Sequence, residues 1–177
     1  MSDDPWERYQ AEKLREEQAS RAAVVLSKRA DLSQQQEIVV VKDVKDKSDL
    51  LWIMTVTKVD LTQYDSSQSV RIVLIDPSGK IDPESCPVLE GNLSLSQGGG
   101  SFHIGDTIAR EKDRGRGTLL VEGLKDLALQ WQVHKISGRA MPVPDTPEEQ
   151  KRLNCFWKRR GFHVGDQSPH PSISLSL

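Results

Sequence analysis

The sequence has few cysteines, few aromatic residues and no long hydrophobic run. Its two cysteines, Cys86 and Cys155, lack the spacing of a zinc site and are too few for a disulfide framework, so we expect reduced thiols and no bound metal. No apolar stretch approaches the roughly 20 residues that cross a bilayer, and the acidic, polar start of the chain is unlike a secretory signal. We therefore expect a cytoplasmic protein without a membrane partner.

The sequence also has no large excess of either positive or negative charge. The chain has 24 basic and 26 acidic residues, and the formal net charge of -2 argues against a general nucleic-acid binder. Its 177 residues and 36% apolar content suit one domain with a normal core.

Residues 5–30 mix Glu, Lys and Arg with Trp6, Tyr9 and Leu14, which predicts a charged helix. Such a helix is either solvated and frayed or packed on a partner chain, for example in a homodimer. We predict that residues 1–34 form this helical extension and that residues 35–177 form the domain.

Alternating or β-branched runs predict strands in most of that domain. The predicted strands are 37–41, 50–59, 70–75, 92–96, 102–108, 134–140, 162–164 and 173–177. We predict a charged turn at 42–49 and a loop or irregular edge at 80–90. One helix follows Gly117, and a second is capped by Thr146 and ended by Gly161. This mixture predicts an α+β fold.

The stretch from Lys112 to Leu120 combines two glycines with three cations directly ahead of the first of these helices. The backbone N–H groups that open a helix favour an anion, and glycine lets the chain approach a phosphate. The plain alternative is a glycine turn that happens to precede a helix. A P-loop is disfavoured because its Gly-Lys-Ser/Thr ending is absent, and a dinucleotide fold is disfavoured because the third glycine is absent.

Lys112-x-x-Gly115-x-Gly117 resembles Gln/Arg-x-x-Gly-x-Gly/Ala, the coenzyme A signature of the GNAT superfamily of acyl-coenzyme A-dependent N-acyltransferases. Lys112 departs from the usual Gln or Arg. A second match follows in the family's order, because residues 156–162, Phe-Trp-Lys-Arg-Arg-Gly-Phe, resemble Phe-Tyr-x-x-x-Gly-Phe at the end of the family's fourth helix. The resemblance covers roughly residues 91–177.

This resemblance implies a GNAT-like fold: a mixed, mostly antiparallel sheet, splayed between its fourth and fifth strands and flanked by helices, here with an extra N-terminal helix. Acetyl-coenzyme A, or another acyl-coenzyme A, would lie in the gap and give its acyl group directly to an amine of unknown identity, so we expect an N-acetyltransferase. The end of strand 102–108 would offer N–H groups to the thioester carbonyl. The cofactor-binding residues implied are Thr107, Ile108, Ala109, Lys112, Asp113, Arg114, Gly115, Arg116, Gly117, Thr118, Asn154 and Trp157.

The proton donor departs from the family pattern. Trp157 stands where many relatives carry a tyrosine that protonates the departing thiolate, and indole cannot do so at neutral pH. Either the thiolate leaves without a protein acid, or Asn154, Cys155 or a water serves, or catalysis is lost. Gln150 replaces the usual asparagine seven residues earlier. The cations of this helix form a solvated face or meet the 3′-phosphate: Lys151, Arg152, Lys158, Arg159 and Arg160.

The candidates for the general base are Asp106, His103 and Glu90, and we name Asp106 together with Asn154 and Cys155 as catalytic candidates. His103 and Asp106 are an odd number of residues apart, which on a regular strand predicts that they face opposite ways.

The upstream half departs further, because the family's pair of helices between its first two strands has no counterpart in the sequence. The acceptor groove would be built instead by residues 43–49, 60–69 and 80–90, or by a neighbouring chain. The alternative hypothesis is therefore a non-catalytic binding or assembly module with an acyltransferase-like fold.

Overall fold

The computed structural model describes residues 5–79, 83–110, 114–166 and 170–177. Its elements follow in the order α1 (Pro5–Ser33), β1 (Ile38–Lys45), β2 (Leu51–Thr57), β3 (Ser67–Ile75), a 3₁₀ turn (Pro83–Ser85), β4 (Val88–Ser94), β5 (Gly100–Ile108), α2 (Arg116–Gln130), β6 (Val133–Arg139), α3 (Pro147–Lys158), β7 (His163–Val164) and β8 (Ser172–Ser176).

The strands form one mixed sheet in the order β1-β2-β3-β4-β5-β6-β8-β7. Neighbouring strands run antiparallel, except that β5 and β6 are parallel. The parallel pair needs a crossover, which α2 supplies. The α+β prediction is therefore confirmed, and the last two strands, β7 and β8, pair antiparallel.

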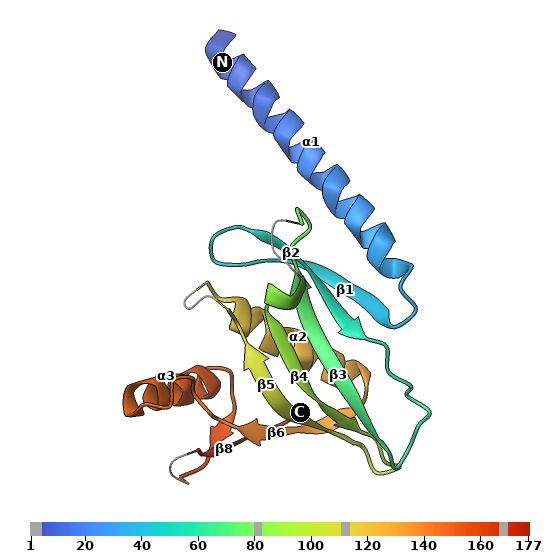
Figure 1. Ribbon diagram of the computed structural model, residues 1–177, viewed down its shortest axis with the longest axis vertical. Coiled ribbons are helices and arrows are strands. Elements are labelled where there is room, and N and C mark those ends of the chain that lie inside the picture. Colours follow the sequence, from blue (N-terminus) through green and yellow to red (C-terminus); the bar gives the residue numbers. More distant parts are fainter. Residues whose placement is uncertain (1–4, 80–82, 111–113, 167–169) are drawn as a thin grey trace.

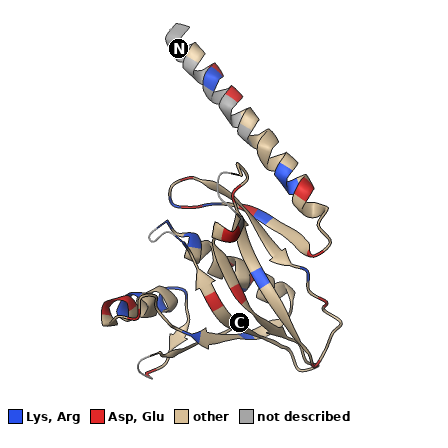
Figure 2. Cartoon of the chain, viewed as in Figure 1, with Lys and Arg blue, Asp and Glu red and all other residues tan. Residues whose placement is uncertain are grey.

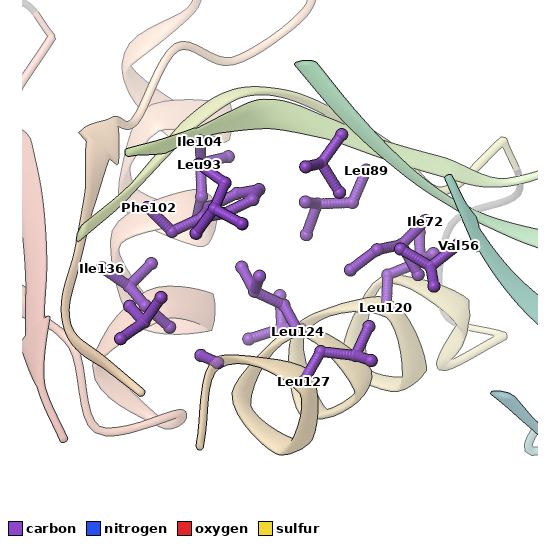
Figure 3. Close-up of a cluster of buried hydrophobic side chains, with 14 of the residues drawn as sticks. Val56, Ile72, Leu89, Leu93, Phe102, Ile104, Leu120, Leu124, Leu127 and Ile136 are labelled. Carbon is purple, nitrogen blue, oxygen red and sulfur yellow. The ribbon is translucent and has the colours of Figure 1, made fainter. Parts of the chain in front are cut away.

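α2 covers one face of the sheet (Figure 1). Its Leu120 and Leu124 point at Leu89, Leu93 and the other inward side chains of the strands, and all four are fully buried (Figure 3). Leu120 and Leu124 are four residues apart, so they lie on one face of α2, and that face is the buried one. Gly123 lets α2 approach closely, because a Cβ there would stand 2.4 Å from Met54 Sδ.

α1 meets the domain only near its C-terminal end and otherwise extends away from it (Figure 1). Val25 and Leu32 pack with Ile53 in a small cluster on the sheet face opposite α2. An ion pair of 3.0 Å joins Arg29 to Asp43 on β1. The helix prediction for 5–30 is confirmed, and no described helix has the length and apolar character needed to cross a membrane.

Three strand boundaries were predicted wrongly, one of them the start of β3, at Ser67 instead of residue 70. β1 continues to Lys45, although residues 42–45 were assigned to a turn, because Val44 packs against the main core while Lys42 pairs with Asp126 on α2. β4 begins at Val88, inside the predicted loop, because Val88 and Leu89 are buried and pair with β3. Residues 80–82 of that loop lie outside the described residues.

α3 begins as the sequence predicts. The Thr146 hydroxyl accepts a hydrogen bond of 3.3 Å from the Glu149 N–H, Pro147 takes the first helical position, and Gly161 follows the helix with φ of 83°.

An N-cap hydroxyl such as that of Thr146 typically contributes about 0.5–2 kcal/mol to stability. We expect Thr146→Ala to lower the free energy of unfolding by about 1 kcal/mol in urea titrations, whereas Thr146→Ser should keep it; equal losses in both would contradict the cap.

Candidate functional site

The pairing between the parallel strands β5 and β6 ends half-way along β5. Their register runs from Gly100↔Val133 to Ile104↔Gly138, whereas β5 continues to Ile108. The side of β5 that faced β6 is therefore left without a strand partner in the described part of the chain, directly before the chain turns into α2. The sheet is splayed at this point, as the resemblance predicts.

The start of α2 is open to an anion. Gly115 at the N-cap position is left-handed, with φ of 81°, and has no side chain with which to cap the helix. No acidic residue lies in the first turn. The N–H groups of Arg116, Gly117 and Thr118 are thus the first-turn donors that an anion would meet.

Arg116 does not point toward such an anion. Its side chain is 4% exposed, its Nε lies 3.1 Å from Asp46 Oδ2, and its guanidinium stacks 4.5 Å from the Trp52 ring centre. The sequence predicts an arginine side chain that helps to bind pyrophosphate. The structure instead gives that side chain a place in the core, so only the backbone N–H of Arg116 remains for the site.

Asp46 holds Arg116 and Trp52 in place, because its carboxylate accepts hydrogen bonds from both side chains. Its carboxylate also accepts hydrogen bonds from the Trp52 indole at 3.2 Å, the Ser48 N–H at 2.8 Å and the Leu50 N–H at 3.2 Å. Burial raises the pKa of Asp46, but these hydrogen bonds outweigh burial and bring the pKa below its ordinary value of 3.8. A buried charge is stable only when it is paired in this way.

The β1–β2 turn, residues 46–50, consequently lies over Arg114 and Gly115, the residues directly before α2. Lys47 N–H donates to the Arg114 carbonyl at 3.0 Å, and Arg114 donates to the Ser48 hydroxyl at 2.6 Å. The Lys47 stem also runs 3.0 Å from the Cβ position of Gly115. The sequence gives little signal for this contact, because residues 46–50 look like an ordinary solvated turn.

α3 lies across the open end of the gap (Figure 1). Gln150, near its start, donates to the carbonyl of Ala140 at the end of β6, at 3.1 Å. Phe156, near its end, lies 3.5 Å from the Cβ position of Gly117, as does Ala109 after β5. Arg160 stacks 3.7 Å from the Phe156 ring centre and donates to the Thr118 hydroxyl. Burial lowers the pKa of Arg160, but an arginine stays charged at neutral pH, so this cation stands beside the start of α2.

Three buried polar atoms beside the gap have no hydrogen-bond partner among the described residues. One is the Thr107 hydroxyl on β5, and the other two are the Trp157 indole N–H and the Gln150 side-chain carbonyl on α3. Buried polar groups are normally hydrogen-bonded, so unpaired ones favour a bound polar ligand. The donors and acceptors of an amide-containing chain such as pantetheine fit this set.

The gap lies between the parallel strands β5 and β6, and the crossover helix α2 begins soon after β5 ends. Along the chain, β6 is followed by α3 and then by the antiparallel pair β7 and β8. The fold is GNAT-like. The helices that the family places between its first two strands are replaced by the five-residue turn 46–50, which leaves the sheet face opposite α2 bare over β3, β4 and β5 in the described ranges (Figure 1).

No family model matches this sequence, and no curated protein matches it either. Solved structures of GNAT-like shape are similar to it. Naa50 of Arabidopsis thaliana, in complex with the bisubstrate analogue CoA-Ac-MVNAL, is 16% identical, with a TM-score of 0.46 over 60% of this chain and 72% of that one. An aminoglycoside 6′-acetyltransferase type Ii is 11% identical, with a TM-score of 0.42 over 61% and 68%.

The three catalytic candidates do not form one cluster in the GNAT-like fold. Asn154 and Cys155 line a hollow of about 600 Å³ along α3, together with Gln150, Lys151 and Lys158. Gln150 donates to Asn154 at 2.8 Å. Asp106 lies instead on the bare face of β5 and accepts from the Thr107 N–H at 2.7 Å. Lys112 and Asp113 lie outside the described residues, so their predicted roles stay predictions.

Proposed function

We propose that this chain is an acyl-coenzyme A-dependent N-acyltransferase, with acetyl-coenzyme A as the simplest donor and a cytoplasmic setting. The observation that carries the proposal is the end of the β5–β6 pairing at Ile104 and Gly138, immediately before the uncapped start of α2. The gap suits the arm of the donor, and the helix start suits its phosphates.

The donor supplies an acyl group activated as a thioester. The N–H groups from Thr107 to Ala109 would hold its carbonyl oxygen and stabilise the negative charge that develops there when an amine attacks. The Thr107 N–H, which donates to the Asp106 carboxylate at 2.7 Å, would exchange that acceptor for the carbonyl oxygen. Arg114, the first turn of α2 and Arg160 would bind the phosphates. Trp157 is 3% exposed, and its ring centre lies 4.9 Å from that of Phe162. It would line the binding site for the donor and offer its indole N–H as a hydrogen-bond donor, but it would not act as an acid.

Calorimetry with acetyl-coenzyme A tests this proposal. We expect one-site binding in the wild type and about tenfold weaker binding, 1.4 kcal/mol, in Gly117→Glu, because its carboxylate would stand among the phosphates. A Cβ at Gly117 meets its neighbours at 3.5 Å, an ordinary contact, so Gly117→Ala should fold and bind nearly normally.

Gly98→Glu is the matched control, because it adds the same charge at an exposed position with nothing within 4 Å of its Cβ. Equal weakening by both glutamates would point to net charge alone. No binding by the wild type would remove the proposal. Binding without transfer to any amine of a broad panel would instead favour the non-catalytic module.

A further inference from the structure

Resting on this proposed function, we infer that the acceptor amine approaches over the bare sheet face and that His103 takes its proton, held in position by Ser137. The inference names the general base of the reaction and the side from which the acceptor arrives. It rests on the geometry of β5 where that strand leaves β6.

His103 and Asp106 lie on the same face, contrary to the prediction from their spacing. Asn92 pairs with His103 and Glu90 pairs with Asp106, so β5 holds one residue more than β4 between these pairs. The extra residue is Gly105, a bulge that interrupts the alternation. Paired residues share a face, and Glu90 and Asn92 are two apart, so His103 and Asp106 both point outward; both are exposed.

His103 is the last outward-facing residue of β5 whose partner is on β6. Its partner is Ser137, and the Nδ1 of His103 lies 3.2 Å from the Ser137 hydroxyl. One residue later the pairing ends. The imidazole therefore stands at the vertex of the gap. In the tautomer that donates from Nδ1 to Ser137, the lone pair of Nε2 is free to accept a proton.

The bare face around His103 is polar in three successive rows, and the next row, Val73, Val88 and Ile108, is apolar. Three rows of paired residues cross β3, β4 and β5: Ser67, Ser94 and Ser101; Ser69, Asn92 and His103; and Arg71, Glu90 and Asp106. Figure 2 shows basic and acidic segments side by side on this face. Since no described helix covers it, an amine carried on a protruding chain can reach the vertex.

The charged groups that face the imidazole come from each neighbouring strand. Glu90 is paired with Arg71 at 2.7 Å, while Lys135 and Arg139 flank Ser137 on β6. The Asp106 carboxylate faces the same side as His103 and would attract the ammonium form of the acceptor. Among these groups, His103 is the one that combines the position where β5 leaves β6 with a ring nitrogen that can accept a proton.

The step balances with the groups named. The amine nitrogen bonds to the thioester carbonyl carbon, the carbon–sulfur bond breaks, and the amine proton passes through a bridging water to His103 Nε2, because four strand residues, about 13 Å, separate His103 from Thr107. The thiolate leaves and takes a proton from solvent, and the imidazolium returns its proton to solvent across the open face. No further reactant is needed.

The test uses the full chain, acetyl-coenzyme A and the best amine of the panel. We expect His103→Gln to lower kcat about a hundredfold and to remove the acid limb of the kcat/KM profile, with the affinity for acetyl-coenzyme A kept within about threefold. Ser137→Ala should lower kcat several-fold and shift that limb. His163→Gln, an exposed histidine on β7, is the control and should change neither.

A second readout does not need turnover. The ring-proton resonances of His103 should move when acetyl-coenzyme A is added, and should stay when adenosine 3′,5′-bisphosphate, which lacks the arm, is added. Unmoved resonances despite acetyl-coenzyme A binding, or a normal kcat and pH profile in His103→Gln, would overturn the inference. Absence of binding in the wild type would instead overturn the proposed function itself.

Discussion

Asp46→Ala is expected to lower the free energy of unfolding by about 3–5 kcal/mol, because it leaves the buried Arg116 guanidinium without its counter-charge. The Arg116 side chain is 4% exposed, so water cannot replace the carboxylate. Trp52 and the N–H groups of Ser48 and Leu50 would lose the same acceptor. Urea unfolding at neutral pH measures the loss.

Asp31→Ala is the matched control, since Asp31 is exposed near the end of α1, and its removal should change stability by no more than about 0.5 kcal/mol. If Asp46→Ala cost no more than this control, the β1–β2 turn would not anchor the loop that leads into α2. Because the loop is held by that turn, we also expect Asp46→Ala to weaken acetyl-coenzyme A binding.

The ion pair between Asp46 and Arg116 also predicts how the stability of the fold depends on acid pH. The pKa of Asp46 is lowered in the folded protein, so its contribution to stability is complete well above its ordinary value of 3.8 and is lost as the pH falls through the lower folded value. The stability difference between the wild type and Asp46→Asn should therefore be largest near neutral pH and shrink in acid. A difference that stays constant down to pH 2 would contradict this role.

Gly91→Ala is expected to cost about 3 kcal/mol, an upper-range value for overpacking. A Cβ at this position would stand 2.4 Å from Phe102 Cε1 and 2.5 Å from the His103 carbonyl oxygen. Phe102 is fully buried, and the carbonyl belongs to the strand, so neither can move aside cheaply.

Gly91 is paired with Ile104 beside the bulge, so its substitution should also displace His103 and lower acyl transfer. Gly98→Ala is the control, because nothing lies within 4 Å of its Cβ position, and thermal unfolding compares the two. Equal midpoints for both variants would show that β4 and β5 do not approach as closely as the structure has them.

Local signals explain why much of the fold could be predicted. The cap at Thr146, the left-handed Gly161 and the apolar face of α2 are each encoded within a few consecutive residues. The splay followed from the resemblance, whose motifs lie in the same C-terminal half. These features depend little on what the rest of the chain does.

Features that join distant residues could not be predicted. Asp46 and Arg116 are 70 positions apart, and each sits in a charged stretch that reads as solvated. Lys42 and Asp43 look like a turn but pair with Asp126 on α2 and Arg29 on α1, on opposite sides of β1. Gly105 shows no sign of a bulge in sequence, although that bulge reverses the predicted facing of Asp106.

The most direct test of the central claim is an amide NMR titration of the full chain with acetyl-coenzyme A. The account predicts saturable shifts in the N–H signals of Thr107 to Ala109 and of Gly115 to Thr118, with the signals of β1 and of the hairpin at 96–99 unchanged. Shifts confined to other surfaces, or none at all at millimolar donor, would contradict a donor lying between β5 and β6 with its phosphates on α2.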